Sequence, residues 1–149
     1  MRTSPFTPQL EVHEITADAL ESRAQDCLQQ GMRFLMAWHD WEEDDVCVLR
    51  YLLSRPENPQ FLLLELRASR QIPSLAKLVP LLGWYEREMQ ELGGVEFLDH
   101  PEPYPLVIHE GYQLAAAPLG PQYSGESIAG AYAPPTMPEV ANDQVQDLY

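Results

Sequence analysis

The sequence predicts an α+β fold, in which helices pack on a small, mainly antiparallel sheet and an extended, proline-rich C-terminal arm follows. Three observations predict this fold. Apolar residues recur at helical spacing between 16 and 31, three strand-like runs between 32 and 69 have hairpin-length links, and the composition changes near residue 113. We therefore expect a domain over residues 1–112 and an extended or disordered arm over residues 113–149.

The N-terminal part of the domain is predicted to contain one amphipathic helix. Residues 1–15 are expected to be an irregular or extended lead-in, because Pro5 and Pro8 oppose a helix. The helix then begins after Thr16, a possible N-cap residue, and Gly31 is the expected residue just beyond its end. Its apolar face is formed by Leu20, Ala24, Cys27 and Leu28.

The three strand-like runs are predicted to form an antiparallel meander. The first strand covers residues 32–41, the second residues 46–54 and the third residues 61–69. The third run is apolar over four consecutive residues, which indicates a central strand. In the first strand we expect one side to carry Phe34, Met36 and Trp38.

The links between these strands are polar or rich in proline. Residues 40–45 contain five acids, whose mutual repulsion favours a solvated turn. A calcium-binding EF-hand loop would need ligands at alternate positions and a central glycine, and the segment has no glycine. Residues 56–59 have a proline at each end and are predicted to form a loop.

After the predicted sheet, the pattern returns to helix. Ser74 could cap a short helix that extends to Leu82, and a second helical piece is expected over residues 84–92. Gly93 and Gly94 would end it, because glycine adopts the left-handed conformation without a steric penalty. The chain beyond is expected to be irregular, with prolines at positions 101, 103 and 105.

Charge excludes some classes of partner. The net charge is −14, the basic residues concentrate between 46 and 80, and no lysine or arginine follows Arg87. Nucleic acids and anionic membrane surfaces need a strong basic face, which this weakly positive middle segment does not supply. A basic protein partner, or simply solubility, explains the acidity better.

The sequence also lacks the common signatures of cofactor sites and membrane insertion. Cys27 and Cys47 are too few for a zinc or iron–sulfur site, and we expect them to be buried, inert thiols. The longest apolar runs are far shorter than a bilayer span, and the N-terminus has no signal-like apolar core. We therefore predict a cytoplasmic protein without direct membrane insertion.

A motif between residues 72 and 101 identifies a family. It consists of Ile72, Pro73, Ser74, Leu75, Pro80, Trp84, the triplet Glu86-Arg87-Glu88, Gly94, Val95, Phe97, His100 and Pro101. These residues resemble the family of the C subunit in the peripheral arm of complex I. That family includes the C subunit of NADH:quinone oxidoreductase and the equivalent subunit of membrane-bound nickel–iron hydrogenases. The resemblance covers about residues 15–112.

The chain departs from the family pattern at several positions. Glu91 replaces the family's aspartate after the triplet, Gly93 replaces a phenylalanine, and the paired arginines expected after Pro101 are missing. The chain therefore resembles a divergent, short member. Contacts that the family makes through those arginines do not transfer to it.

The resemblance implies a cofactor-free scaffold subunit of a complex-I-like or hydrogenase-type oxidoreductase, without catalytic residues of its own. It would form a hetero-oligomer with the large catalytic subunit and the iron–sulfur small subunit, on the cytoplasmic side of a membrane complex. The motif residues expected at interfaces are Pro73, Trp84, Glu86, Arg87, Glu88, Gly94, Phe97, His100 and Pro101. A free-standing assembly or interaction protein that retains the fold is the alternative.

The charged triplet has three possible roles. An internal ion-pair network, an interface and direct proton transfer all stay open, and Arg87 is expected to pair with an acid from elsewhere in the fold or from a neighbour. An enzyme that uses Glu86, Glu88 and His100 as acid–base groups has no supporting nucleophile or cofactor motif. A metal site formed by His100, His109 and Glu110 is disfavoured by their spacing across a proline-rich loop.

The predicted arm contains scattered aromatic residues but too few large apolar residues to form a core. A purely solvating tail would have little use for aromatic side chains. We therefore expect it to lie across a partner, with Tyr123, Tyr132 and Tyr149 as anchors.

Overall fold

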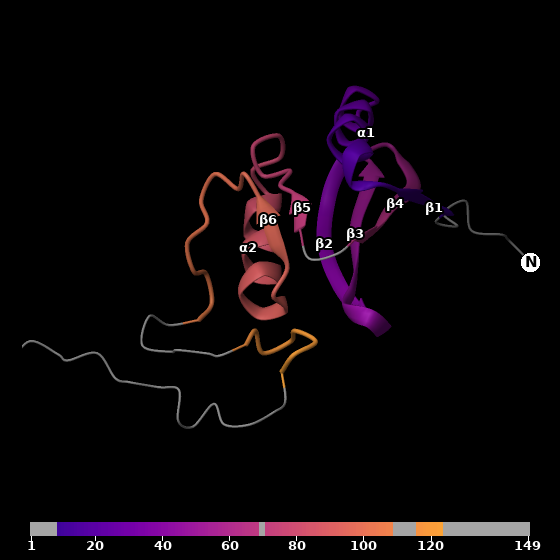
Figure 1. Cartoon of the computed structure of the whole chain (residues 1–149). Coiled ribbons are helices and arrows are strands. Elements are labelled where there is room, and N and C mark those ends of the chain that lie inside the picture. Colours follow the sequence, from indigo (N-terminus) through magenta and orange to yellow (C-terminus); the bar gives the residue numbers. More distant parts are fainter. Residues whose placement is uncertain (1–8, 69–70, 109–115, 124–149) are drawn as a thin grey trace, which may run out of the picture.

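The computed structural model describes residues 9–68, 71–108 and 116–123, and Figure 1 shows the arrangement of their elements. The fold is α+β with a mainly antiparallel sheet and two helices, as the sequence predicts. In chain order the elements are β1 (Gln9–Ile15), α1 (Ala17–Gln29), β2 (Arg33–Glu42), the 3₁₀ helix η1 (Glu43–Asp45), β3 (Val46–Arg55), β4 (Asn58–Ala68), β5 (Gln71–Pro73), α2 (Leu82–Gly93) and β6 (Glu96–Leu98).

The main sheet has the strand order β1-β4-β3-β2. Strands β2, β3 and β4 form the predicted antiparallel meander, and β4 is central, as its apolar run indicates. The described part of the lead-in is extended, one of the two forms predicted, but its pairing with the sheet was not predicted. Its residues 9–15 form β1, which pairs in parallel with β4 and has Val12 beside Leu63. This pairing satisfies the backbone groups along one side of β4 and makes it an interior strand.

Helix α1 buries the predicted face, with Leu20, Ala24 and Cys27 at most 1% exposed. Thr16 occupies the N-cap position, but its side chain makes no capping hydrogen bond. At the other end Gly31 has a φ of 77°. The N–H of Met32 donates to the carbonyl of Cys27 at 3.0 Å, and the N–H of Gly31 donates to the carbonyl of Leu28 at 3.0 Å. This pattern is a Schellman motif, so Gly31 ends the helix as predicted.

Strand β2 carries a β-bulge between Phe34 and Met36, so its side chains do not alternate between the two faces as predicted. The bulge inserts one residue, so the side chains after it point to the opposite side from the one that simple alternation gives. Phe34 and Ala37 are therefore buried, whereas Met36 is 40% exposed. The expectation that Phe34, Met36 and Trp38 share one side was wrong.

The strand links are close to those predicted. The acidic segment forms η1 and connects β2 to β3 as a turn. The proline-containing loop is shorter than expected, because β4 already begins at Asn58.

The region after β4 differs most from the prediction. No helix forms between Ser74 and Leu81, where the described backbone makes turns instead. Helix α2 is continuous from Leu82 to Gly93, and Gly94 ends it in the left-handed conformation, with a φ of 74°. The segment expected to be irregular contains β6, which pairs in parallel with β5. Three-residue strands carry too little periodicity to be recognised in a sequence.

Both helices pack on the same face of the main sheet. Their buried residues join one core cluster with alternate residues of β3 and β4, from Cys47 to Leu53 and from Leu62 to Leu66. In Figure 1, α2 lies beside β2, and the segment after β6 runs along the other side of α2. In the part of the chain that the structure describes, no helix is long and apolar enough to cross a membrane.

Most of the predicted arm lies outside the described residues, and so do Tyr132 and Tyr149. The division at residue 112 and the three anchors stay predictions. Of the arm, residues 116–123 are described and form turns, in which Tyr123 is partly buried. The N–H of Leu119 donates to the carbonyl of Leu92 at 2.6 Å, which connects these turns to the end of α2.

The end of α1 gives a test of backbone conformation alone. A Cβ at Gly31 would meet no atom within 4 Å, so Gly31→Ala should destabilise the fold only through its positive φ. We expect a loss of about 1 kcal/mol in the free energy of unfolding, measured by urea denaturation. Gly31→Asn should lose clearly less, because asparagine tolerates the left-handed region. Equal losses for the two variants would contradict this explanation.

Candidate functional site on helix α2

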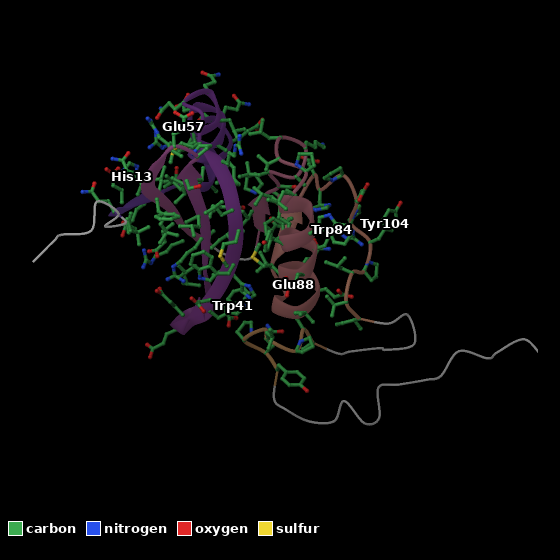
Figure 2. The ribbon with its side chains drawn as sticks, turned by 180° about the vertical axis from the view of Figure 1, so that it is seen from behind. His13, Trp41, Glu57, Trp84, Glu88 and Tyr104 are labelled. Carbon is green, nitrogen blue, oxygen red and sulfur yellow. The ribbon has the colours of Figure 1, made fainter. Side chains whose placement is uncertain are left out.

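Helix α2 directs the three charged residues of the triplet to three different surroundings. Successive helical residues are rotated by about 100°, so Glu86, Arg87 and Glu88 cannot face the same way. Glu86 points into the core, Arg87 contacts the segment after β6, and Glu88 lies toward β2. Figure 2 shows α2 between the sheet and the segment that carries Tyr104.

Glu86 is the buried charged residue of the described core, with 0% exposure. Its carboxylate accepts hydrogen bonds from the Ser74 hydroxyl and from the Leu75 N–H, the latter at 2.8 Å. Burial raises the pKa of Glu86 to about 7, because desolvation disfavours the charged form more than these hydrogen bonds favour it. Ser74 therefore does not cap a helix as predicted but binds this carboxylate.

His100 lies beside Glu86 and is also buried, with a side chain 3% exposed. Its Nδ1 accepts the N–H of Glu102 at 3.0 Å, so the proton of the neutral ring is on Nε2. Nε2 lies 3.3 Å from the carbonyl oxygen of Gly83 and 3.7 Å from the Glu86 carboxylate. His100 thus makes its hydrogen-bond contacts with nearby backbone groups. Ser74, Glu86 and His100 together form a buried polar cluster that joins α2 to the chain on either side of it.

Among the described residues, Arg87 contacts backbone carbonyls and a ring in place of an acid, and its predicted pairing with an acid of a neighbouring subunit stays a prediction. Its Nε donates to the carbonyl of Tyr104 and its Nη2 to that of Pro105, both at 2.8 Å. The guanidinium also lies over the ring of Trp84, 5.7 Å from the ring centroid. The planar donor geometry of arginine suits two neighbouring carbonyls as well as it suits a carboxylate.

Glu91 continues this contact one helical turn further on. Its Oε2 accepts the N–H groups of Leu106 at 3.0 Å and Val107 at 2.6 Å, and its Oε1 accepts that of Ile108 at 2.7 Å. Arg87 and Glu91 thus bind five consecutive residues, which we call the 104–108 segment. Sequence reasoning assigned Glu91 no role. Its position four residues after Arg87, on the same helix face, is the signal that could have revealed it.

Glu88 faces a cavity of about 210 Å³ between α2 and β2. The cavity is lined by Ala37, Trp38, His39, Glu88, Met89, Leu92 and Leu119. Burial lowers the pKa of His39, although the Asp40 and Glu88 carboxylates oppose this shift. Figure 2 labels Glu88 on α2 and Trp41 on β2.

Gly93 allows β2 and the end of α2 to approach closely. A Cβ at this position would lie 2.1 Å from Nε2 of His39, so any larger residue would require the imidazole to move. The indole N–H of Trp41 donates to the Gly93 carbonyl at 2.9 Å. The His39 imidazole thus occupies the space that a larger side chain at position 93 would need.

The remaining motif residues shape the backbone around α2. Pro73 ends β5 opposite Leu98, and Phe97 is 6% exposed in β6 opposite Ile72. Gly94 ends α2, and Pro101 is exposed beyond His100. These side chains do not converge on one cavity. They shape the connection between α2 and the β5–β6 pair.

Metal-binding and thiol chemistry have little geometric support in the described part of the chain. No group of three or more His, Cys, Asp or Glu side chains that could hold a metal ion occurs there. His109 and Glu110 lie outside the described residues. Both cysteines are buried and free, as predicted, and burial raises the pKa of Cys27 and brings that of Cys47 to about 11.

Comparison with protein families gives a match over most of the chain. Residues 11–128 match the family described as "Respiratory-chain NADH dehydrogenase, 30 Kd subunit". This range includes β1 from Glu11 on, the rest of the main sheet, both helices and every motif residue.

Two characterised proteins are similar in sequence. The C subunit of the F(420)H(2) dehydrogenase of Methanosarcina mazei is 34% identical over 89 residues, which are 58% of this chain and 56% of that protein. The C/D subunit of the NADH-quinone oxidoreductase of Aeromonas hydrophila is 29% identical over 111 residues, which are 73% of this chain and 18% of that protein. The chain thus matches about half of the first relative and less than a fifth of the second.

A solved structure has the same fold. A chain of the membrane-bound sulfane sulfur reductase, an archaeal respiratory membrane complex, superposes with a TM-score of 0.58 at 17% identity. The alignment covers 65% of each chain. At this identity the likeness shows the fold alone.

Because the pKa of Glu86 is raised, we expect the free energy of unfolding to depend on pH. The folded-state pKa of about 7 exceeds the ordinary glutamate value of 4.5, so the folded state binds the proton more tightly. This contribution is complete below the unfolded pKa, decreases as the pH rises, and is lost above about pH 7. Its size is about 3 kcal/mol at most. Glu86→Gln should abolish this decrease in urea unfolding measured between pH 5 and 8.

The matched control for this measurement is Glu57→Gln, in the exposed turn between β3 and β4. It should keep the wild-type dependence on pH. A Glu86→Gln profile parallel to that of the wild type would show that another group causes the slope.

The Glu91 hydrogen bonds predict that the rate of hydrogen exchange in the 104–108 segment depends on this side chain. Glu91→Gln replaces a charged acceptor of three N–H groups by a neutral one with a single carbonyl oxygen. Hydrogen exchange at Leu106, Val107 and Ile108 should become about tenfold faster or more, because hydrogen bonds to charged groups contribute about 1.5–3 kcal/mol. Glu88→Gln, on the same helix, should leave these three rates unchanged. Equal effects of the two variants would contradict the assignment.

Proposed function

The chain belongs to the family of the respiratory-chain NADH dehydrogenase 30 Kd subunit, and on this basis we propose that it is a scaffold subunit of a complex-I-like respiratory oxidoreductase. The names of its relatives support this proposal, because both are subunits of dehydrogenase or oxidoreductase assemblies. Its partners would be the large catalytic subunit and the iron–sulfur small subunit, in a hetero-oligomer on the cytoplasmic side of a membrane. A hydrogenase-type assembly is an equivalent host.

The observation that carries the proposal is that polar side chains on α2 form hydrogen bonds with other groups of the same chain. Glu86 binds Ser74 and Leu75 in the core, and Arg87 and Glu91 bind the backbone of the 104–108 segment. Polar groups used in this way fix the shape of the protein. The geometry therefore supports a structural role for these residues, as the proposed scaffold requires.

The outer side of α2 supplies a candidate docking surface. Trp84 is 62% exposed, and Tyr104 and Val107 of the adjacent 104–108 segment are 70% and 57% exposed. Leu81, just before the helix, is 47% exposed. Large aromatic residues held in place by a rigid backbone are typical anchors of protein interfaces. The Arg87 contacts hold Trp84 and the Tyr104 backbone next to each other.

The alternative is a free-standing assembly or interaction protein. The missing arginines after Pro101 and the acidic C-terminal half of the chain favour it. In that role the protein would purify as a monomer or homodimer without any iron–sulfur protein.

Affinity purification distinguishes the two functions. The tagged full-length chain, purified from its native cells in mild detergent, should recover a large catalytic subunit and an iron–sulfur subunit identifiable by mass spectrometry. Trp84→Ala should reduce this recovery about tenfold or more, because a central tryptophan can contribute about 2 kcal/mol or more to an interface. Glu57→Ala, in the exposed β3–β4 turn, is the control. Recovery of the wild-type chain alone would favour the free-standing protein.

A further inference from the structure

The main sheet has one face packed against the helices and one face without them. The core cluster takes from β3 and β4 only the residues on the helix side. Alternate residues of the same strands point to the other side, which we call the open face. In the described ranges, neither helix contributes a residue to this side.

The open face carries a continuous apolar patch. The strand register places Val12 beside Leu63, Leu63 beside Leu52, and Leu52 beside Met36, so one apolar row crosses all four strands. Leu10 lies beside Phe61 in the next row on the same face. The open-face patch therefore consists of Leu10, Val12, Met36, Leu52, Phe61 and Leu63.

Several patch residues are well exposed to solvent. Leu10 is 57% exposed, Val12 54% and Met36 40%, and the other three are partly exposed. An exposed apolar patch of this kind is typical of an interaction site. It is separate from the docking surface on the outer side of α2, because α2 packs on the opposite face of the sheet.

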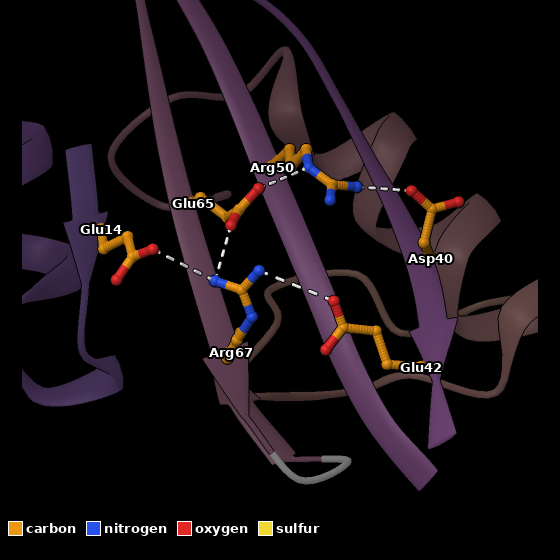
Figure 3. Close-up of polar contacts among 6 residues, drawn as sticks. All are labelled: Glu14, Asp40, Glu42, Arg50, Glu65 and Arg67. Carbon is orange, nitrogen blue, oxygen red and sulfur yellow. Dashed lines mark hydrogen bonds and ion pairs between the residues drawn. The ribbon is translucent and has the colours of Figure 1, made fainter. Parts of the chain in front are cut away.

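The residues next to the patch form a charged network, shown in Figure 3. Arg50 pairs with Asp40 and, at 2.8 Å, with Glu65. Arg67 pairs with Glu65 at 2.7 Å, with Glu14 at 3.4 Å and with Glu42 at 3.6 Å. Four carboxylates thus surround two guanidinium groups, which leaves an excess of negative charge beside the patch. Asp40 and Glu14 are 64% and 79% exposed and accessible to a further cation.

At the patch, the central strands have the composition of a sheet covered on both sides, although they carry charged residues further along. An antiparallel sheet with one solvated face shows apolar and polar residues in alternation. In β4 the run from Phe61 to Leu64 is apolar on both faces, and β3 places the partly exposed Leu52 on the open face. Polar residues would be expected at these positions if water covered this face.

We propose that the open-face patch binds an amphipathic segment of another protein subunit, whose apolar side covers the patch and whose Lys or Arg residues meet Asp40, Glu14 and Glu42. Charge selects this occupant. A second copy of this chain would bring another net charge of −14, and an anionic lipid surface would meet the same acidic residues. This inference rests on the proposed function, because the segment belongs to a subunit of the same assembly.

Site-specific photo-crosslinking in the assembled complex tests the proposal. A photoreactive phenylalanine analogue replaces Met36 or Val12 in the tagged full-length chain, which is purified from its native cells after irradiation. We expect both positions to crosslink to one peptide of another subunit that contains several apolar residues and at least one Lys or Arg. The control position is Gln25, exposed on α1, which should not crosslink to that peptide. Crosslinks only to this chain, to a second copy or to lipid, or none at all, would overturn the proposal.

A pair of charge variants gives an independent measurement. Val12→Glu combined with Met36→Glu should reduce recovery of the crosslinked subunit about tenfold or more, because it buries two carboxylates against the apolar side of the bound segment. Ser22→Glu combined with Gln25→Glu adds the same charge on the exposed side of α1 and should change recovery less than twofold. The thermal midpoints of both purified variants should stay close to that of the wild type, because all four positions are exposed or partly exposed. If the first pair unfolds the protein, the crosslinks alone decide.

The outcomes separate this inference from the proposed function. If the wild-type chain recovers no redox subunit, both are wrong. If the wild-type chain and the Val12/Met36 variant recover the subunits equally, whereas Trp84→Ala loses them, only the inference about the open face is wrong.

Discussion

The buried carboxylate of Glu86 is the interaction on which the arrangement around α2 depends. It lies in the core with 0% exposure, and its hydrogen bonds to Ser74 and Leu75 fix the chain that leads from β5 toward α2. His100, 3.7 Å away, extends the same cluster to the loop beyond β6. Removing a carboxylate from water is costly, so such a group persists only where its hydrogen bonds give a unique local structure. Here that structure is the joint between α2 and the β5–β6 pair.

The fixed position of Glu86 also sets the directions in which the other side chains of α2 point. Because successive helical residues point in different directions, the buried Glu86 places Arg87 on the outer side and Glu88 toward β2. Arg87 and Glu91 hold the 104–108 segment through backbone groups, so the exposed Trp84 and Tyr104 lie on a rigid support. Rigid aromatic residues lose little conformational entropy on binding, which suits the proposed role as a scaffold.

The two faces of the sheet suit a subunit that is incomplete by itself. One face is covered by both helices, whereas the other carries the open-face patch beside the ion pairs of Arg50 and Arg67. An isolated domain gains only cross-strand contacts from apolar residues such as Val12 and Leu63 on a solvated face, whereas a subunit within an assembly can also bury them. Family membership, the exposed side of α2 and the open face thus all support the proposal that neighbouring subunits cover these surfaces.

The sequence by itself determined the features that depend on local pattern. The helical spacing of Leu20, Ala24 and Cys27, the ends of the helices at Gly31 and Gly94, and the three-stranded meander all follow from periodicity and backbone preference, and the motif around the triplet revealed the family. Only the tertiary structure decided the short strands β5 and β6, the bulge in β2, the backbone partners of Arg87 and the role of Glu91. The physical reason is distance along the chain. A hydrogen bond between residues about 15 apart, such as that of Glu91 with Leu106, depends on where packing brings two segments, and no local periodicity encodes that.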